Sequence, residues 1–161
     1  MFQLGYRLEP LNEKIYNMKR DESLAPLSRE HQKALLLAQL LKLDAPNYKG
    51  LPTSIAGKAE YALQVFNHDL LTHFTKEEQM LKLIMNYKPE IDVLIHEIFE
   101  EHEQLRNLFL NIPDSTDLKN DLATIGSVLD AHVRKEERIL FPLLQQLCTP
   151  IQLQQIHELL H

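Results

Sequence analysis

The sequence predicts an all-α protein, arranged as an up-down-up-down four-helix bundle with an N-terminal extension and a short C-terminal helix. Long segments rich in Leu, Gln, Glu, Lys and Ala alternate with short segments that contain Pro, Gly or Asp, as helices alternate with turns. No segment alternates apolar and polar residues between turn residues, the pattern of a half-buried strand. Most connections are short, which favours antiparallel neighbouring helices.

The composition indicates one domain over residues 1–161, with the bundle at about 27–147. The chain of 161 residues is 44% hydrophobic, which suffices for one core but not for two ordinary domains. A net charge of -6 offers no basic surface for nucleic acid or for an anionic membrane. No apolar run is long enough to span a bilayer, and the start of the sequence lacks the pattern of a signal peptide. We therefore expect a cytoplasmic location and no membrane or nucleic-acid partner.

The single cysteine, Cys148, restricts the chemistry that the protein can use. It cannot form an internal disulfide, and one thiolate excludes a cysteine-rich zinc or iron–sulfur site. Any bound metal must therefore be held by nitrogen and oxygen atoms.

The first two helices are separated by the longest connection. A helix is expected over residues 27–43, with Ser28 near its start. The stretch DAPNYKGLPT, with two prolines and one glycine, then ends it, and a second helix is expected over residues 54–86. Residues 1–24 carry no clear periodicity, so we expect an irregular or partly helical extension there.

The remaining helices begin with recognisable signals. Pro89 suits the first turn of a third helix, which runs to about Ile112, where IPDSTD ends it. A fourth helix follows from Asp117 or a neighbouring residue to about residue 147. Thr149 and Pro150 are typical of the cap and first position of a short terminal helix.

Two similar phrases, HFTKEE at 73–78 and HVRKEE at 132–137, lie in the second and fourth helices. Positions that alternate by three and four form the stripe of a helix that faces the centre of a bundle. In both helices a histidine and a glutamate occupy the middle of this otherwise apolar stripe. The stripes are Leu63, Phe66, Leu70, His73, Glu77, Met80 and Ile84, and Leu122, Ile125, Leu129, His132, Glu136, Ile139 and Leu143.

The other two helices each place one histidine in their apolar stripe. These stripes are Leu27, His31, Ala34, Ala38 and Leu41, and Ile91, Ile95, Ile98, His102, Leu105, Phe109 and Ile112. His73 and His102 both lie about 13 residues from the turn between their helices, which is about 20 Å along each helix axis. We therefore expect one polar layer across the bundle.

Such a layer has the chemistry of a metal site. Residues four apart share a helix face, so each phrase presents an imidazole and a carboxylate to one point. A buried carboxylate costs several kcal/mol unless it is neutralised or bound to a cation. Imidazole with carboxylate suits iron, zinc or manganese, and two carboxylates that can bridge indicate two ions. The predicted ligands are His31, His73, Glu77, His102, His132 and Glu136.

The glutamates Glu78 and Glu137 fall one residue off the stripe, toward solvent or a helix interface. At the fourth helix the choice between Glu136 and Glu137 stays open, because an i+5 carboxylate can reach a metal where a helix is distorted.

Four segments together resemble the hemerythrin-like, HHE cation-binding domain family. They are REH at 29–31, HFTKEE at 73–78, EEH at 100–102 and HVRKEERILFP at 132–142. The resemblance covers about residues 27–147. It implies a non-haem centre of two iron ions with an oxo or hydroxo bridge inside a four-helix bundle, with zinc or manganese as other possible metals. It also implies that the four histidines of the layer are terminal ligands and that Glu77 and Glu136 bridge the irons.

One departure from that family bears on function. Oxygen-carrying hemerythrins have a further histidine one turn from the ligand of the third helix, whereas this sequence has Ile98 and Arg106 around His102. The set of four histidines and two glutamates resembles the branch of the family linked to nitric-oxide stress, iron–sulfur cluster repair and iron or oxygen sensing. Repair members carry an additional cysteine-containing N-terminal domain, which this sequence lacks. We expect a centre that binds O2, NO or peroxide for sensing, scavenging or iron handling, with no redox partner identified.

Two alternatives remain. The centre can turn over as a peroxidase-like or repair enzyme, although no separate acid, base or nucleophile is recognisable. Alternatively, the layer is a buried His–Glu network that fixes helix register in a metal-free structural bundle.

The other polar groups are expected to be structural or exposed. His68 and His96 do not share a face with the predicted ligands, and His157 and His161 share one only near the chain end. The acidic run FEEHEQ at 99–104, together with Lys135 and Arg138, is expected to form a solvated helix face. The phenylalanines expected in the core, some of them beside the metals, are Phe66, Phe74, Phe109 and Phe141.

Overall fold

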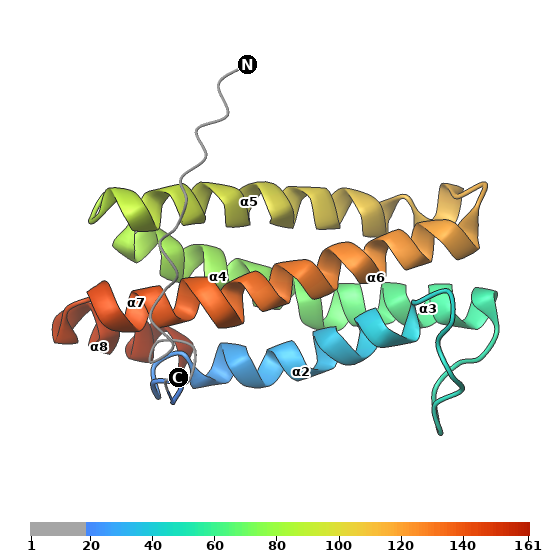
Figure 1. Cartoon of the computed structure of the whole chain (residues 1–161), viewed down its shortest axis with the longest axis horizontal. Coiled ribbons are helices and arrows are strands. Elements are labelled where there is room, and N and C mark those ends of the chain that lie inside the picture. Colours follow the sequence, from blue (N-terminus) through green and yellow to red (C-terminus); the bar gives the residue numbers. More distant parts are fainter. Residues whose placement is uncertain (1–18) are drawn as a thin grey trace, which may run out of the picture.

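The computed structural model describes residues 19–161, which contain helices and no strand. Four long helical segments lie side by side along the long axis of the molecule (Figure 1). The predicted all-α helical bundle is thus confirmed. Of the predicted N-terminal extension, residues 1–18 lie outside the described range, and residues 19–24 contain a turn but no helix. Within the described range, no helix has both the length and the apolar character needed to cross a membrane.

The four long segments are one or more helices each. The first is α2 (Ala25–Leu40), and the second consists of α3 (Ile55–Val65), η1 (Phe66–Leu70) and α4 (Leu71–Ile84). The third is α5 (Pro89–Leu110), followed by a short 3-10 turn, η2 (Ile112–Asp114). The fourth consists of α6 (Leu118–Lys135), η3 (Glu136–Leu140) and α7 (Phe141–Leu147), and α8 (Pro150–Leu160) follows it.

Local sequence signals explain most of these boundaries. The first helix begins two residues before the predicted start, because Pro26 is tolerated in its first turn, and it ends at Leu40. The hydroxyl of Ser54 caps α3 by accepting a hydrogen bond from the Gly57 amide at 3.0 Å. Thr149 forms a capping box at α8, as its sequence position predicts.

Two π-helical turns interrupt segments that were predicted as continuous α-helices. In each of them, η1 and η3, an amide N–H donates to the carbonyl five residues earlier: Leu71 to Phe66, and Phe141 to Glu136. Pro142 gives a physical reason for η3, because it has no N–H to donate and its ring crowds the carbonyl four residues before it. No proline or glycine lies within or directly after η1.

The extra residue of η3 changes which side chains are buried from Ile139 onward, in η3 and in α7. Leu140 and Leu144 are fully buried, whereas the predicted stripe residues Ile139 and Leu143 are only partly buried. The predicted apolar stripe of the fourth segment is therefore wrong by one residue beyond Glu136, because a π turn adds one residue to the helix. In α2 and α5, which contain no such turn, every predicted stripe residue is buried.

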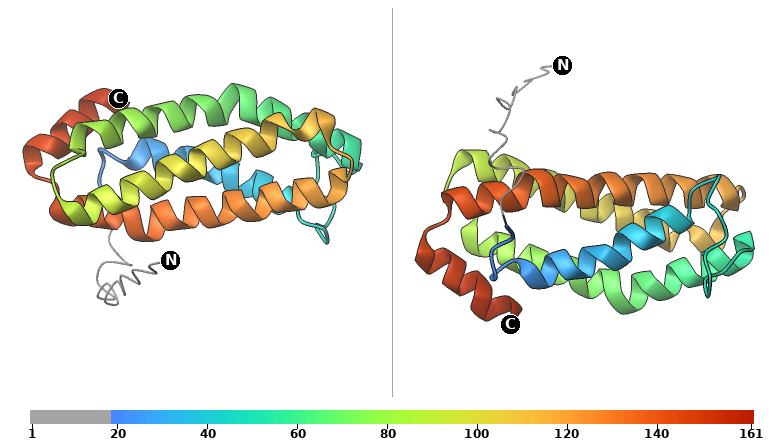
Figure 2. Two further views of the ribbon diagram at one scale, coloured as in Figure 1. Left: turned by 90° about the horizontal axis from the view of Figure 1, so that it is seen from above. Right: turned by 60° about the horizontal axis from the view of Figure 1, so that its bottom comes forward.

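The apolar core consists of two separate clusters. One includes Phe66, Phe109 and Leu129, and the other includes Met80, Ile95 and Leu144. The short helix α8 packs against α4 and adds Ile156 to the second cluster. The C-terminus consequently lies beside the start of α2, as Figure 2 shows.

At Gly126, α6 lies close to the backbone of α2. A Cβ atom at this position would lie 2.8 Å from the carbonyl oxygen of Ala38 and 3.1 Å from the Cβ of Leu41. The Ala38 carbonyl oxygen is backbone, so a substitution requires the two helices to move apart.

We therefore expect Gly126→Ala to lower the free energy of unfolding. Overpacking costs about 1–3 kcal/mol and the gain in helix propensity is about 1 kcal/mol, so the net loss is expected to reach about 2 kcal/mol. Urea unfolding followed by circular dichroism measures the change. The matched control is Ser127→Ala at the exposed neighbouring position. An increase in stability for Gly126→Ala comparable to that of the control would contradict the close packing.

Candidate metal centre

The structure brings together all six residues predicted as ligands. They form a layer between the two apolar clusters, and none of the six is more than 4% exposed. Each long segment contributes: His31 from α2, His102 from α5, and a histidine with a glutamate from each of the other two. Those two pairs are His73 with Glu77 on α4, and His132 on α6 with Glu136 at the start of η3.

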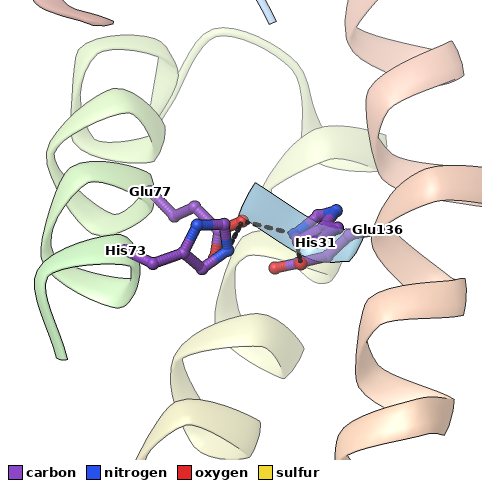
Figure 3. A group of neighbouring side chains, drawn as sticks. All are labelled: His31, His73, Glu77 and Glu136. Carbon is purple, nitrogen blue, oxygen red and sulfur yellow. Dashed lines mark hydrogen bonds and ion pairs between the residues drawn. The ribbon is translucent and has the colours of Figure 1, made fainter. Parts of the chain in front are cut away.

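The six residues form two four-membered groups that share both glutamates. One group is His31, His73, Glu77 and Glu136, and the other is Glu77, His102, His132 and Glu136. Within each group, one potential ligand atom per residue lies within 4.8 Å of all the others. Figure 3 shows the first group, in which His73 and Glu77 extend from one helix toward His31 and Glu136 from two others.

Each shared carboxylate directs one oxygen toward each group. Oε1 of Glu77 lies 2.9 Å from Nε2 of His73, while its Oε2 lies 3.1 Å from Nε2 of His102. Oε2 of Glu136 lies 2.9 Å from Nε2 of His31, while its Oε1 lies 3.2 Å from Nε2 of His132. This disposition is that of a carboxylate able to bridge two cations.

Three buried polar atoms of the layer, within residues 19–161, have no hydrogen-bond partner. They are Nε2 of His132 and both carboxylate oxygens of Glu136. The atoms lie close to one another, but their angles do not meet hydrogen-bond geometry. A buried carboxylate without partners is strongly unfavourable, and a bound cation would remove that cost. The residues therefore fit a pair of metal ions.

The charges of the layer depend on one another. Burial alone would raise the pKa of Glu77, but the histidines around it lower that pKa well below its usual range. Burial and the charge of Glu77 act to raise the pKa of Glu136, yet nearby histidines bring it below its usual range. Burial would lower the pKa of the histidines, but the carboxylates raise it to about 11 for His102 and about 9 for His132. Both carboxylates are thus ionised and suited to a cation.

The second glutamate of each repeated phrase has a different position. Glu137 does not face the centre but lies 2.6 Å from Nδ1 of His31, and Glu78 lies 2.9 Å from Nδ1 of His102. Because η3 begins at Glu136, the ordinary spacing of four between His132 and Glu136 is retained. Of the two candidates on the fourth segment, Glu136 is the one that points into the layer.

Sequence reasoning missed two further carboxylates. Glu30 lies 2.6 Å from Nδ1 of His73, and Glu101 lies 2.7 Å from Nδ1 of His132. The expectation that the FEEHEQ run and Lys135 are solvated was therefore wrong for Glu101 and for Lys135, which binds it. Arg138 is exposed as expected.

The sequence does contain a signal for these two carboxylates, because a glutamate directly precedes a histidine of the layer in both REH and EEH.

Two phenylalanines cover the layer. Phe74 stacks on His102 with ring centroids 4.2 Å apart, and Phe141 is parallel to His31 at 5.6 Å. All four predicted core phenylalanines are buried. Because Phe74 and Phe141 belong to different apolar clusters, they cover the layer from its two sides and shield it from water.

The remaining histidines and the cysteine lie outside the layer. His68 and His96 are exposed, and His157 stacks on His161 near the C-terminus with centroids 3.9 Å apart. Cys148 is buried among apolar side chains, and this burial raises its pKa to about 11. None of these residues belongs to either four-membered group.

Comparison with known protein families identifies a match over most of the chain. Residues 22–144 match the family described as the Hemerythrin HHE cation binding domain. No curated protein and no solved structure matches the chain. The matched range contains all six residues of the layer and the glutamates around it.

The raised pKa of His132 makes the stability of the metal-free protein depend on pH. Unfolded histidine titrates near pH 6.5, so the folded chain binds an extra proton between that pH and about 9. This stabilisation is fully present below about pH 6.5 and is lost as the pH rises through about 9. Urea unfolding of metal-free protein is expected to give a free energy that falls over this range.

The control is His68→Gln, at an exposed histidine, which should leave the slope with pH unchanged. A free energy of unfolding that stays constant between about pH 6.5 and about pH 9 would contradict a protonated histidine layer.

Proposed function

The chain belongs to the hemerythrin HHE cation-binding family, and from that premise we propose that it is a non-haem di-iron protein. Its metal pair binds a small molecule such as O2, NO or peroxide, in a sensing, scavenging or iron-handling role. The observation that carries the proposal is the buried pair of four-donor groups that share Glu77 and Glu136. The oxygens of Glu136 support it, because no hydrogen bond satisfies them and a metal ion would do so.

Each residue of the layer has a role in this proposal. His31 and His73 would hold one ion, His102 and His132 the other, and the two glutamates would bridge them. Two imidazoles and two carboxylates per ion leave coordination positions open, which is typical of non-haem iron sites. Zinc and manganese accept the same donors. Bound iron supplies redox chemistry and the open positions at which a small ligand can bind.

The residues around His102 support a centre with two histidines per ion. Ile98 is fully buried in an apolar cluster, and Arg106 donates a hydrogen bond to Glu78 at 2.7 Å. The Arg106 guanidinium also lies over the Phe74 ring, 5.7 Å from its centroid. Neither side chain supplies a further nitrogen ligand at the positions one turn from His102.

A groove gives a small ligand an approach to the centre. It has a volume of about 710 Å³ and lies between α2, η1, α4 and the C-terminus. Its walls include His73, together with Glu30 and Lys76 beside it. The histidine itself is only 4% exposed, so a diatomic molecule or peroxide suits this approach better than a larger substrate.

Three broader expectations complete the proposal. They are an up-down-up-down order of the four long segments, a single domain over residues 1–161, and a cytoplasmic location. Short connections support the up-down-up-down order, and the size and composition of the chain support a single domain. The cytoplasmic location follows from the sequence pattern alone.

The first test is the metal content of the full chain after anaerobic reconstitution with ferrous iron. We expect about two iron ions per chain, the number that two four-donor groups can hold. His73→Ala and Glu136→Gln should each reduce the content, since one removes a terminal ligand and the other a bridging charge. His68→Ala, at an exposed histidine five residues before His73, is the control. Wild-type protein that binds no iron, zinc or manganese would favour the metal-free structural bundle.

The second test addresses the small ligand. The optical spectrum of the reduced, iron-loaded protein is expected to change on exposure to at least one of O2, NO and peroxide, because each ion keeps open positions. An unchanged spectrum with all three would contradict small-ligand binding. Steady-state consumption of peroxide or NO with a reductant, lost in Glu136→Gln, would instead identify the centre as an enzyme.

A further inference from the structure

Each histidine of the layer uses both ring nitrogens. Nε2 faces the shared carboxylates, and Nδ1 faces one of four others, which we call the outer carboxylates: Glu30, Glu78, Glu101 and Glu137. The distances from Nδ1 to the carboxylate oxygen are 2.6 Å for His31 and Glu137, 2.6 Å for His73 and Glu30, 2.9 Å for His102 and Glu78, and 2.7 Å for His132 and Glu101. All four histidines are therefore held in the same way.

These contacts link the four long segments in a closed circuit. Glu30 on α2 contacts the histidine of α4, and Glu78 on α4 contacts the histidine of α5. Glu101 on α5 contacts the histidine of α6, and Glu137 in η3 contacts the histidine of α2. Every segment thus gives one histidine to the centre and one outer carboxylate to the next segment.

A cation holds each outer carboxylate in place. In three cases the cation lies on the helix that carries the histidine, so the carboxylate is held between two groups of one neighbouring helix. In the fourth case the cation is Arg20, which precedes α2, the helix of His31. The pairs are Lys76 with Glu30 at 2.6 Å, Arg106 with Glu78 at 2.7 Å, Lys135 with Glu101, and Arg20 with Glu137 at 2.8 Å. Lys76 and Lys135 are the fourth residues of HFTKEE and HVRKEE. The charged residues that the two segments share are this lysine and the two glutamates after it, and each of them has a contact described above.

The pair of Arg20 and Glu137 has a second function at η3. The guanidinium also donates to the backbone carbonyl of Glu137 at 2.8 Å. Pro142 has no N–H to offer this carbonyl, which lies five residues before it. The Arg20 guanidinium lies 5.2 Å from the ring centroid of Phe141, which is stacked on His31.

The chemical consequence concerns the tautomer of each imidazole. A neutral imidazole carries one N–H, and its other nitrogen is the metal ligand. A carboxylate at Nδ1 accepts that N–H, so the lone pair of Nε2 points toward the centre. Such partners of ligating histidines also make the ligand nitrogen more basic and fix the ring orientation.

We propose that the four outer carboxylates are positioning residues, which fix all four histidines with Nδ1–H outward and Nε2 toward the metal pair. This inference rests on the proposed function, because it assigns a metal to the Nε2 side. The circuit of contacts supports it more strongly than a single contact would, since four independent helix pairs repeat the same geometry.

The test uses the full chain with Glu101→Ala and Glu101→Gln, and cobalt(II) as the metal probe. Visible absorption of bound cobalt reports both affinity and coordination. Glu101→Ala should weaken cobalt binding by about 10–100-fold. Glu101→Gln should lose less, because its amide oxygen still accepts the Nδ1–H of His132. The control is Glu100→Gln, at the exposed glutamate next in sequence, which should bind as wild type.

A second readout separates positioning from a merely structural role. Long-range ¹H–¹⁵N correlation spectra of the zinc-loaded protein report which nitrogen of His132 carries its proton. The Nδ1 proton should be present in wild type and Glu101→Gln and should be lost or exchange rapidly in Glu101→Ala. Wild-type affinity and an unchanged His132 spectrum in Glu101→Ala would overturn this inference alone. Failure of the wild-type chain to bind any metal would overturn the di-iron proposal and this inference with it.

Discussion

The burial of two carboxylates constrains the rest of the structure. Glu77 and Glu136 lie in the middle of a bundle whose other inward positions are almost all apolar, and neither is more than 1% exposed. Water cannot solvate them there, so the fold must surround them with positive charge or with a cation. The four histidines are the only other buried polar residues of this layer within residues 19–161, and all four direct Nε2 toward these two groups.

The sequence predicted the layer because it lies on uninterrupted helical geometry. Along α2 and α5 every residue that a spacing of three and four assigned to the stripe is buried, and His31 and His102 lie in the centre. The same rule was wrong after Glu136, where η3 adds one residue. Pro142 signals that interruption, but a proline within a helix predicts a disturbance and not its form. The geometry of η1 has no comparable signal in the sequence.

The outer carboxylates could not be predicted in the same way. Each of them lies next to a stripe residue in sequence, a position that a single helix assigns to solvent or to an interface. Whether such a side chain meets a histidine depends on the rotation and height of the neighbouring helix, which periodicity within one helix does not specify. The two Glu-Glu pairs and the two Glu-His pairs in the sequence limit which glutamates are candidates for contact with a histidine. The packing of the four helices then determines which histidine each glutamate contacts.

The division of the core has a consequence for cooperativity. Phe66 and Phe109 belong to one apolar cluster, Met80 and Ile95 to the other, and a layer of charged groups separates the two. Apolar contact therefore does not run unbroken from one end of the bundle to the other, and the coupling between the ends passes through the layer. We expect that loss of a bound cation would weaken that coupling and that the two ends of the metal-free chain would then open with separate free energies, which amide hydrogen exchange can resolve.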